Sequence, residues 1–538
     1  MSARDDFDQV VTGDPSRRLG PPRAPAPRGS RLDDAWARWS ADPRFSRLWR
    51  WGAPALVLLV AAVLRLWNLG HPHALVFDET YYVKDAYTLM NLGYEGAWPD
   101  EANAAFTGGD PDVYSSDASF IAHPPLGKWI IALGLAAFGA ENALGWRISV
   151  AVAGILLVAA TMLLARMLFR TTTLTVIAGG LLAIEGNAIV MSRVALLDTM
   201  LALFALLGAI AIVLDQRWSR RRLDDWIARR EAEGRHTDWG PALLWRPWLL
   251  TAAVAFGAAS AVKWSGFYFL AVFGVASIVM DALARRRAGI AFWATGSVLR
   301  QGPASFVLLV PLAAVVNVAS WAGWFATAGG YYRSWVQNGN PAWGGVLEWV
   351  PLSFQNWWHY QSAMYRYHVG QSSPHSYESP AILWPFSARP TSMFYERLDD
   401  SLVQTITGIP NPLIWWAGTA AALFLVVRLV LARDGRAAVL IVGFVAGYAP
   451  WLLYPERTMF QFYSIAYEPY LVLAITLALG LLLGSPRDPR PRRTVGLAVV
   501  GVFLGLCVAL SAFFLPLWTA MPISEEFLRL HYWFRSWI

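Results

Sequence analysis

The sequence is poor in cysteine and in charged side chains. Its 538 residues include one cysteine, Cys507, which lies inside an apolar run. A single cysteine excludes an intramolecular disulfide framework and argues against a zinc site built from thiolates. Charged residues make up 15% of the chain, whereas hydrophobic residues make up 56%. This composition indicates a polytopic membrane protein rather than a string of soluble domains.

The positive charge of the chain is not gathered on a soluble module. The formal net charge is +7, but Lys and Arg occur in short clusters between apolar runs, where they set the orientation of a membrane protein. A nucleic-acid-binding protein would carry a recurring basic face. We therefore expect no nucleic-acid partner.

Residues 1–50 lack an apolar stretch. The segment PSRRLGPPRAPAPRGSR is rich in Pro and Arg and cannot bury enough surface to fold alone. A cleavable secretory signal is not indicated, because the first apolar run is long and begins after residue 50. We predict a disordered cytoplasmic tail over residues 1–50 and a transmembrane domain over residues 51–538.

Long apolar runs are abundant in the rest of the chain. A bilayer is spanned by about twenty apolar residues, and runs of this kind predict an all-α bundle of about eleven transmembrane helices. The basic clusters then fall on the cytoplasmic side with the N-terminus, and the C-terminus falls outside. A further run, His123 to Gly139, would disturb this agreement if it crossed, so we expect an interfacial helix there. The runs centre near residues 61, 158, 181, 205, 255, 274, 314, 422, 446, 475 and 506.

This topology leaves two large extracytoplasmic segments and one charged connector. Outer loop one covers about residues 70–146, and the second outer loop covers about residues 326–410. The cytoplasmic loop, about residues 215–247, carries charges of both signs and lacks a Gly-rich phosphate loop. We interpret it as a solvated connector rather than a regulatory module.

Two adjacent carboxylates, Asp78 and Glu79, follow the first apolar run in LVFDETYYVKDAY. Adjacent side chains do not share one face of a helix or strand, so a shared-proton dyad is not expected. Partial desolvation among Phe77, Tyr81 and Tyr82 would raise the basicity of a carboxylate that takes a proton from a hydroxyl. On the pattern alone, a helix cap at Asp78 explains the pair slightly better. The membrane setting favours a site, because ionisable groups there are costly.

Other ionisable residues fall on the same outer side and could reach a shared pocket. Arginine presents a planar fork of donors that suits phosphate oxygens, so arginines beside a carboxylate would suit a phosphate-bearing lipid. A snorkelling or structural ion-pair role is equally consistent with each arginine alone, and Arg193 and Asp198 could pair with one another. The residues of this group are Arg147, Glu185, Arg193, Asp198, Lys263 and Arg457.

The histidines carry no metal signature. His123 in IAHPPLGKW could bind a phosphate with Lys128, although capping of the interfacial helix is the simpler role. His359, His368 and His375 are widely spaced among aromatic residues and lack a tight carboxylate partner, which argues against zinc. This loop is more typical of a surface that grips a peptide or a lipid head, or of one that tryptophans anchor. We assign no metal ligands.

Five segments resemble, in order, those of the protein O-mannosyltransferases, and within them the actinobacterial, polyprenyl-phosphate-mannose-dependent branch. FDETYYVKDAY is similar to the family's Asp-Glu motif, HPPLGK to the motif after it, and SRVALLD to its Ser-Arg…Leu-Leu-Asp segment. HSYESPAILWP resembles the second-loop His-x-Tyr…Trp-Pro pattern, and ERTMFQFYSIAYEPY the late Arg…Phe…Tyr segment. The chain departs from eukaryotic members in having no room for inserted β-trefoil domains. It also carries Gln461, Phe462 and Tyr463 where a His-Tyr pair is commoner.

The resemblance implies a GT-C glycosyltransferase fold with the active site outside. The implied reaction is inverting transfer of one mannose from polyprenyl-phosphate-mannose to Ser or Thr hydroxyls of secreted or membrane proteins. Asp78 would be the general base, and Glu79 would orient the acceptor or the loop. Arginines could replace a metal at the phosphate, so no obligatory divalent ion is expected. The implied donor-phosphate and substrate-binding residues are Arg147, Arg457, His123, Lys128, Arg193 and Asp198.

Two other functions remain open from the sequence. A GT-C enzyme could transfer a different polyprenyl-phosphate-linked sugar to a lipid or a glycan with the same base and arginines. A lipid or solute transporter would need charged groups along a path through the bilayer, and the clustering on the outer side argues against it. The expected location is the cytoplasmic membrane, where the secretion machinery would be a further partner of an acceptor that is still unfolded.

Overall fold

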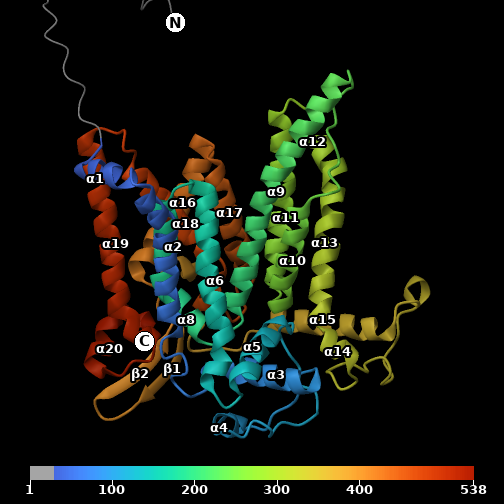
Figure 1. Ribbon diagram of the computed structural model, residues 1–538. Helices are drawn as coiled ribbons and strands as arrows, with labels where there is room; N and C mark the ends of the chain where they lie inside the picture. Colours follow the sequence, from blue (N-terminus) through green and yellow to red (C-terminus); the bar gives the residue numbers. More distant parts are fainter. Residues whose placement is uncertain (1–28) are drawn as a thin grey trace, which may run out of the picture.

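The computed structural model describes residues 29–538, which form a bundle of roughly parallel helices (Figure 1). Among these residues, eight helices are long and apolar enough to cross a membrane, and the pair α7 and α8, bent by 60°, adds a ninth crossing if it is one span. The long helices are α2 (Pro43–Leu66), α6 (Ala143–Phe169), α9 (Asp198–Ala232), α11 (Gly266–Arg287), α12 to α13 (Trp293–Ala319), α16 (Pro412–Ala432), α17 with η4 (Gly435–Leu453) and α19 (Arg490–Trp518).

Each apolar run in the sequence centres on a helix, but some of these helices are short. Helices α10 (Pro247–Val262) and α18 (Glu468–Leu483) have 16 residues each. A helix of that length measures about 24 Å, less than the roughly 30 Å of the hydrocarbon core. The bent pair consists of α7 (Thr172–Ile184) and α8 (Gly186–Arg193). The helical membrane fold is confirmed, and the number of eleven crossings stays a prediction.

The two ends of the bundle carry different structures (Figure 1). One end, called the α3 end below, is covered by helices that lie across the bundle and by a small sheet. The opposite end, called the α1 end, carries α1 and the connection between α9 and α10. The α3 end contains α3 (Glu79–Leu92), α4 (Ala102–Thr107), α5 (Leu126–Phe138), α14 (Ala322–Ala326), α15 (Leu352–Gly370), β1 (Ser392–Arg397), β2 (Leu402–Thr407), β3 (Ile523–Ser524) and α20 (Glu525–His531).

The run from His123 to Gly139 forms α5, which lies beside α3 at the α3 end (Figure 1). Its 13 residues measure about 20 Å, too short to cross the hydrocarbon core. Pro125 occupies the N-cap position, where the absence of an N–H group removes no helical hydrogen bond. This placement agrees with an interfacial helix in outer loop one.

The small sheet was not anticipated from the sequence. Its strands are antiparallel in the order β1-β2-β3, with Phe394 opposite Ile406 and a register shift between Ser392 and Phe394. The sheet is short and lies at the end of the bundle, so the fold remains almost entirely helical.

The structure corrects the expected tail for residues 31–50. Helix α1 (Arg31–Ser40) is capped by Ser30, whose hydroxyl accepts from the Asp33 N–H, and α2 already begins at Pro43. Asp33 also forms an ion pair with Arg493 of α19 at 2.8 Å. These contacts fold a segment that lacks an apolar run. Residues 1–28 lie outside the described part of the chain.

The expected solvated connector, residues 215–247, is also corrected. Helix α9 continues to Ala232, so the first half of this segment is helical. Asp215 and Arg246, near its two ends, are fully buried and form an ion pair. Between these two buried ends most side chains are exposed or half-buried, so the segment is solvated but half of it is helical.

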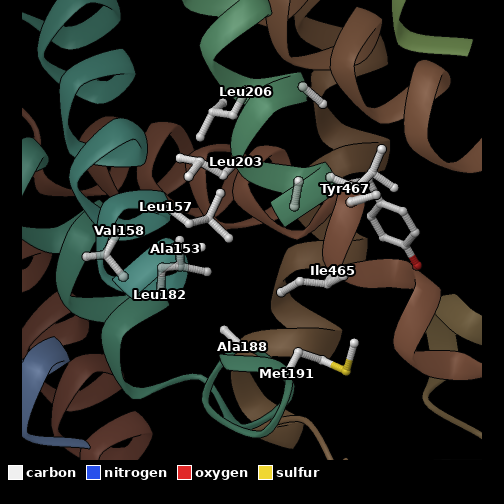
Figure 2. Close-up of a cluster of buried hydrophobic side chains, with 14 of the residues drawn as sticks. Ala153, Leu157, Val158, Leu182, Ala188, Met191, Leu203, Leu206, Ile465 and Tyr467 are labelled. Carbon is white, nitrogen blue, oxygen red and sulfur yellow. The ribbon is translucent and has the colours of Figure 1, made fainter. Parts of the chain in front are cut away.

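The core of the bundle lies between α6, α7, α8, α9 and the segment that leads into α18. Figure 2 shows Leu157 of α6, Leu182 of α7, Met191 of α8 and Leu203 of α9 facing Ile465. All five side chains are buried. This packing fixes the turn after α8 and the segment Gln461–Ala466, and both border the site described next.

Candidate active site

Asp78 lies at the N-cap of α3, with its backbone at φ −71° and ψ −2°. Its side chain makes no capping hydrogen bond, so the capping role does not account for it. The carboxylate accepts a long hydrogen bond of 3.4 Å from the Tyr82 hydroxyl. Burial raises the pKa of Asp78 to about 6, and the nearby charge of Lys263 opposes that rise. A carboxylate with this basicity can accept a proton near neutral pH.

Glu79 is fully buried and belongs to a closed ion pair with Arg147 of α6. Two parallel hydrogen bonds of 2.8 Å join the carboxylate to Nε and Nη2 of the arginine. The carboxylate also accepts from the backbone N–H groups of Val76 and Ala195. Each oxygen therefore has two donors, and the side chain is fixed against the loop and the turn after α8.

Arg147 uses all five of its N–H groups within this part of the structure. Besides the Glu79 carboxylate, it donates to the carbonyls of Leu69, Pro72 and Ala74 at 2.8–3.2 Å. It is 1% exposed, so no donor remains for a lipid phosphate. The expected phosphate role of Arg147 is therefore corrected to one of positioning, because the residue joins outer loop one to the bundle.

A cavity of about 300 Å³ opens at the α3 end. Asp78 is not among its lining residues, but the Asp78 carboxylate lies within electrostatic range of two of them, Lys263 and Asp198. Its walls come from the junction of α10 and α11, from α15 and from the segment around residues 446–466, and eight of the nineteen lining residues are Phe, Trp or Tyr. The polar and charged residues of the wall include His123, Asp198, Lys263, His368 and Arg457. Two cations beside apolar and aromatic surface suit a ligand with an anionic head and a carbon skeleton.

Lys263 is the first cation of the cavity. It lies just after α10, and its ammonium donates to both carboxylate oxygens of Asp198 at 3.0 Å. The same ammonium lies 4.8 Å from the centre of the Tyr463 ring. Asp198 therefore orients Lys263 and does not pair with Arg193, which was one possibility left open by the sequence.

Arg457 is the second cation, and part of its guanidinium has no partner. Nε donates to the His368 carbonyl at 2.9 Å, and Nη2 lies 3.5 Å from His368 Nδ1. Nη1 is buried and makes no hydrogen bond to any residue from 29 to 538. The aromatic rings of Trp451 and Tyr463 flank the guanidinium. Arg457 thus combines a fixed position with donors that remain free for an anion.

Two neutral imidazoles stack against each other beside Arg457. The rings of His123 and His368 are 5.0 Å apart and nearly parallel. Burial lowers the pKa of His368 to about 4 and that of His123 well below its ordinary value. His123 Nδ1 is buried and has no hydrogen-bond partner in the described chain, so its hydrogen-bonding capacity is unused.

Two further residues proposed from the sequence lie away from the cavity wall. Lys128 is buried between Asp85 and Glu95, at 2.9 and 3.1 Å, and so joins α5 to α3 and the segment after it. Arg193 donates to four carbonyls at the end of α2, those of Leu64, Arg65, Trp67 and Asn68. Their expected contacts with the donor phosphate are corrected to structural roles, because both side chains join segments of the fold and neither lines the cavity.

The importance of three residues of this site was not evident from the sequence. Lys263 was visible as a cation inside an apolar stretch, but its pairing with Asp198 depends on how α9 and α10 pack. His368 was one of several histidines in an aromatic loop, and no local signal set it apart. Tyr463 lies in the QFY segment that departs from the usual His-Tyr pair, and it contacts both cations of the cavity. In residues 29–538 no group of three or more metal-ligating side chains comes together.

Comparison with known proteins decides the family. Residues 55–281 match the family described as dolichyl-phosphate-mannose-protein mannosyltransferase, and residues 353–537 match the C-terminal four-transmembrane region of protein O-mannosyltransferase. A polyprenol-phosphate-mannose–protein mannosyltransferase of Mycolicibacterium smegmatis is 34% identical over 504 residues, which cover 90% of this chain and 93% of that protein. The chain belongs to the protein O-mannosyltransferase family.

Other members of the family agree with this assignment. The relatives from Mycobacterium tuberculosis and Corynebacterium glutamicum carry the same name and are 33% and 32% identical, over 91% and 92% of this chain. They are covered over 92% and 95% of their own lengths. One chain of the Saccharomyces cerevisiae Pmt1-Pmt2 complex bound to the sugar donor superposes with a TM-score of 0.68 at 15% identity, and 96% of each chain is covered. This likeness shows the fold of the chain, which is the GT-C fold.

Proposed function

We propose that this protein transfers one mannose from polyprenyl-phosphate-mannose to Ser or Thr hydroxyls of proteins. The donor and the acceptor class are those in the names of the relatives that cover most of the chain. The observation that carries the proposal is the cavity itself. Lys263 and Arg457 line one cavity, and Asp78, a carboxylate of raised basicity, lies within electrostatic range of Lys263.

Asp78 would act as the general base. Its carboxylate takes the proton of the acceptor hydroxyl as the hydroxyl oxygen forms a bond to C1 of mannose. The bond from C1 to the phosphate oxygen breaks, and its electron pair leaves with the polyprenyl phosphate. Attack opposite the phosphate inverts the configuration at C1. Glu79 has no free oxygen for the acceptor, and it would instead fix the loop that carries Asp78.

Arg457 and Lys263 would bind the donor phosphate and stabilise the charge that develops on it. Arg457 contributes the free Nη1 group, and Asp198 keeps Lys263 oriented. Fixed donors at a developing negative charge stabilise the transition state without reorganisation. Because these cations can take the role of a metal ion, we expect transfer without an added divalent ion. His123 Nδ1 would accept a hydrogen bond from a hydroxyl of the sugar.

The reaction would take place on the extracytoplasmic side of the cytoplasmic membrane, at the α3 end. The basic residues near the α1 end, among them Arg285 to Arg287, support this orientation. Acceptors would be secreted or membrane proteins that are still unfolded as they emerge. The secretion machinery would then lie beside the α3 end.

The test is mannose transfer by purified protein in liposomes, with radiolabelled polyprenyl-phosphate-mannose and a Ser/Thr-rich peptide. Wild-type protein is expected to label the peptide, and Asp78→Asn is expected to reduce the rate by about 10²–10⁴-fold, because the amide cannot accept the proton. A chelator should leave the wild-type rate unchanged.

The controls separate this function from its competitors. A peptide with every Ser and Thr replaced by Ala should remain unlabelled, and a different polyprenyl-phosphate-linked sugar should transfer poorly. Label appearing on lipid or glycan instead of peptide would contradict the protein acceptor. Movement of the donor across the liposome membrane with equal rates in wild type and Asp78→Asn, and no transfer, would favour a transporter.

A further inference from the structure

Phe77, the residue before Asp78, has a backbone conformation that bulky side chains rarely adopt. Its φ is +50°, in the left-handed region. The turn around it is closed on both sides by Glu79, whose N–H donates to the Val76 carbonyl and whose carboxylate accepts from the Val76 N–H. The conformation of Phe77 sets the direction in which the chain enters α3, and therefore where the Asp78 carboxylate points.

The ring of Phe77 is held by three aromatic side chains from the C-terminal part of the chain. Phe460 and Phe462 stack on each other with ring centres 5.4 Å apart, and Phe77 meets both rings edge to face at 5.6 Å. His375 of the second outer loop makes a third edge-to-face contact at 6.1 Å. Such contacts are directional, so they fix the orientation of the ring as well as its burial.

The same short segment continues into the cavity wall. Tyr463 follows Phe462 directly, and the two rings are perpendicular at 4.9 Å. Tyr463 in turn contacts the cations Lys263 and Arg457, at 4.8 and 5.8 Å from its ring centre. Residues 460–463 thus contact Phe77 on one side and the two cavity cations on the other.

We propose that Phe77 is a positioning residue, which sets the Asp78 carboxylate relative to Lys263 and Arg457 through its contacts with Phe460 and Phe462. The inference depends on the proposed function, in which Asp78 takes a proton while the two cations receive the leaving phosphate. The left-handed backbone aims the base, and the aromatic contacts maintain that backbone. Outer loop one and the C-terminal half of the chain are joined in this way at the reacting groups.

The test compares three variants in the same liposome assay. Phe77→Leu removes the ring but keeps an apolar side chain, Phe77→Gly accepts the left-handed backbone without any ring, and Phe77→Tyr keeps the ring. The matched control is Tyr114→Leu, which removes another aromatic ring of outer loop one that packs on Trp98 and does not contact Phe77. We expect kcat to fall by roughly 100-fold in the Leu and Gly variants, as a small displacement of a catalytic group does. The donor KM should stay unchanged, and Phe77→Tyr should recover most of kcat.

A second readout reports on Asp78 without any transfer. A hydrophobic carbodiimide reacts with protonated carboxyl groups, and mass spectrometry of peptides gives the pH at which half of Asp78 is labelled. Lys263, Asp198 and Tyr82 are the groups whose charge or hydrogen bond acts on Asp78. Burial is the main cause of the raised pKa of Asp78 and outweighs these contacts. If Phe77 holds Asp78 in its buried position, Phe77→Leu and Phe77→Gly should lower the midpoint of labelling relative to wild type and Tyr114→Leu.

Mannose transfer and the labelling midpoint together show whether the proposed function or the role of Phe77 has failed. A wild-type protein that transfers no mannose contradicts the proposed function, and the labelling midpoint then still tests the placement of Asp78. Wild-type kcat and an unchanged midpoint in Phe77→Leu would overturn the role of Phe77. Full activity of Phe77→Gly would do the same, because the ring would then be unnecessary.

Discussion

Arg147 and Arg457 differ in how many of their N–H groups are already used. Arg147 is saturated by the Glu79 carboxylate and three carbonyls, whereas Arg457 keeps Nη1 without a partner in the described residues. A buried arginine with every donor satisfied holds parts of the fold together, whereas one that lines a cavity and keeps an unused donor can bind a ligand. Arg147 and Arg457 therefore have different roles, although their side chains have the same chemistry.

Replacing each arginine by methionine tests this difference. Arg147→Met leaves the Glu79 carboxylate buried without its cation and should lower the free energy of unfolding by about 3–5 kcal/mol, measured by thermal unfolding in detergent. Arg457→Met should leave the unfolding temperature nearly unchanged and raise the donor KM roughly tenfold or more, the effect of losing a hydrogen bond to a charged group. A raised donor KM for a folded Arg147→Met, with unchanged stability, would restore its phosphate role.

The residues that the sequence could assign are those in local patterns. Asp78 and Glu79 lie together in one short stretch, and their setting beside a membrane span is visible without a structure. The pairing of Lys263 with Asp198, the saturation of Arg147 and the contacts of Arg193 and Lys128 depend on the packing of distant segments. Spacing along the chain carries no information on such contacts, so these roles needed the structure.

At the scale of elements, a buried ion-pair network joins four helices near the α1 end. Arg246, at the N-cap of α10, pairs with Asp215 of α9 and with Asp281 of α11 at 2.6 Å, and it donates to Ser305 of α13 at 3.1 Å. Arg246 is fully buried. Three charges in such a place stabilise the helix packing only while all of them are present.

Removal of the Arg246 cation should therefore destabilise the protein strongly. We expect Arg246→Met to lower the free energy of unfolding by about 3–5 kcal/mol, since two carboxylates would remain buried without a partner. The control is the triple variant Arg246→Met, Asp215→Asn, Asp281→Asn, which should recover much of the loss. Thermal unfolding in detergent compares the two proteins, and equal stability of Arg246→Met and wild type would show that the network contributes little.

Hydropathy located the helices well but not their ends or their bends. The long α9 extends into a charged sequence that looks like a loop, because a helix continues for as long as its polar residues face solvent or ion-pair partners. The bend of 60° between α7 and α8 falls at Glu185, inside a stretch that reads as one apolar run. Glu185 accepts from the Ala188 N–H there and caps α8, a local interaction that a hydropathy window averages away.

In the whole molecule, basic residues gather near the α1 end of the bundle, and the site lies at the opposite, α3 end. Helices α1 and α20 lie at opposite ends of the bundle (Figure 1). The α3 end gathers the carboxylate, the cations and the cavity, and basic residues occur near the α1 end. By the positive-inside rule, we propose that the α3 end lies outside the cytoplasm.

Cysteine labelling of intact cells tests this orientation. The chain offers a convenient background, because Cys507 is the single cysteine and is buried. After Cys507→Ala, we expect Asp110→Cys, at the α3 end, to react with a membrane-impermeant maleimide. Glu233→Cys, exposed beyond α9, should react only after the membrane is opened. The reverse pattern would place the active site in the cytoplasm.

The most direct measurement of the central claim is the pH dependence of kcat/KM for the acceptor peptide, between about pH 5 and pH 8. Asp78 accepts a proton only when its carboxylate is ionised, so transfer should fall as the pH decreases through about 6. His368, with a pKa of about 4, does not titrate in that window. The residual transfer of Asp78→Asn should lack this fall. A wild-type profile that stays flat down to about pH 5, or an acid limb that persists in Asp78→Asn, would contradict the role of Asp78 as the base.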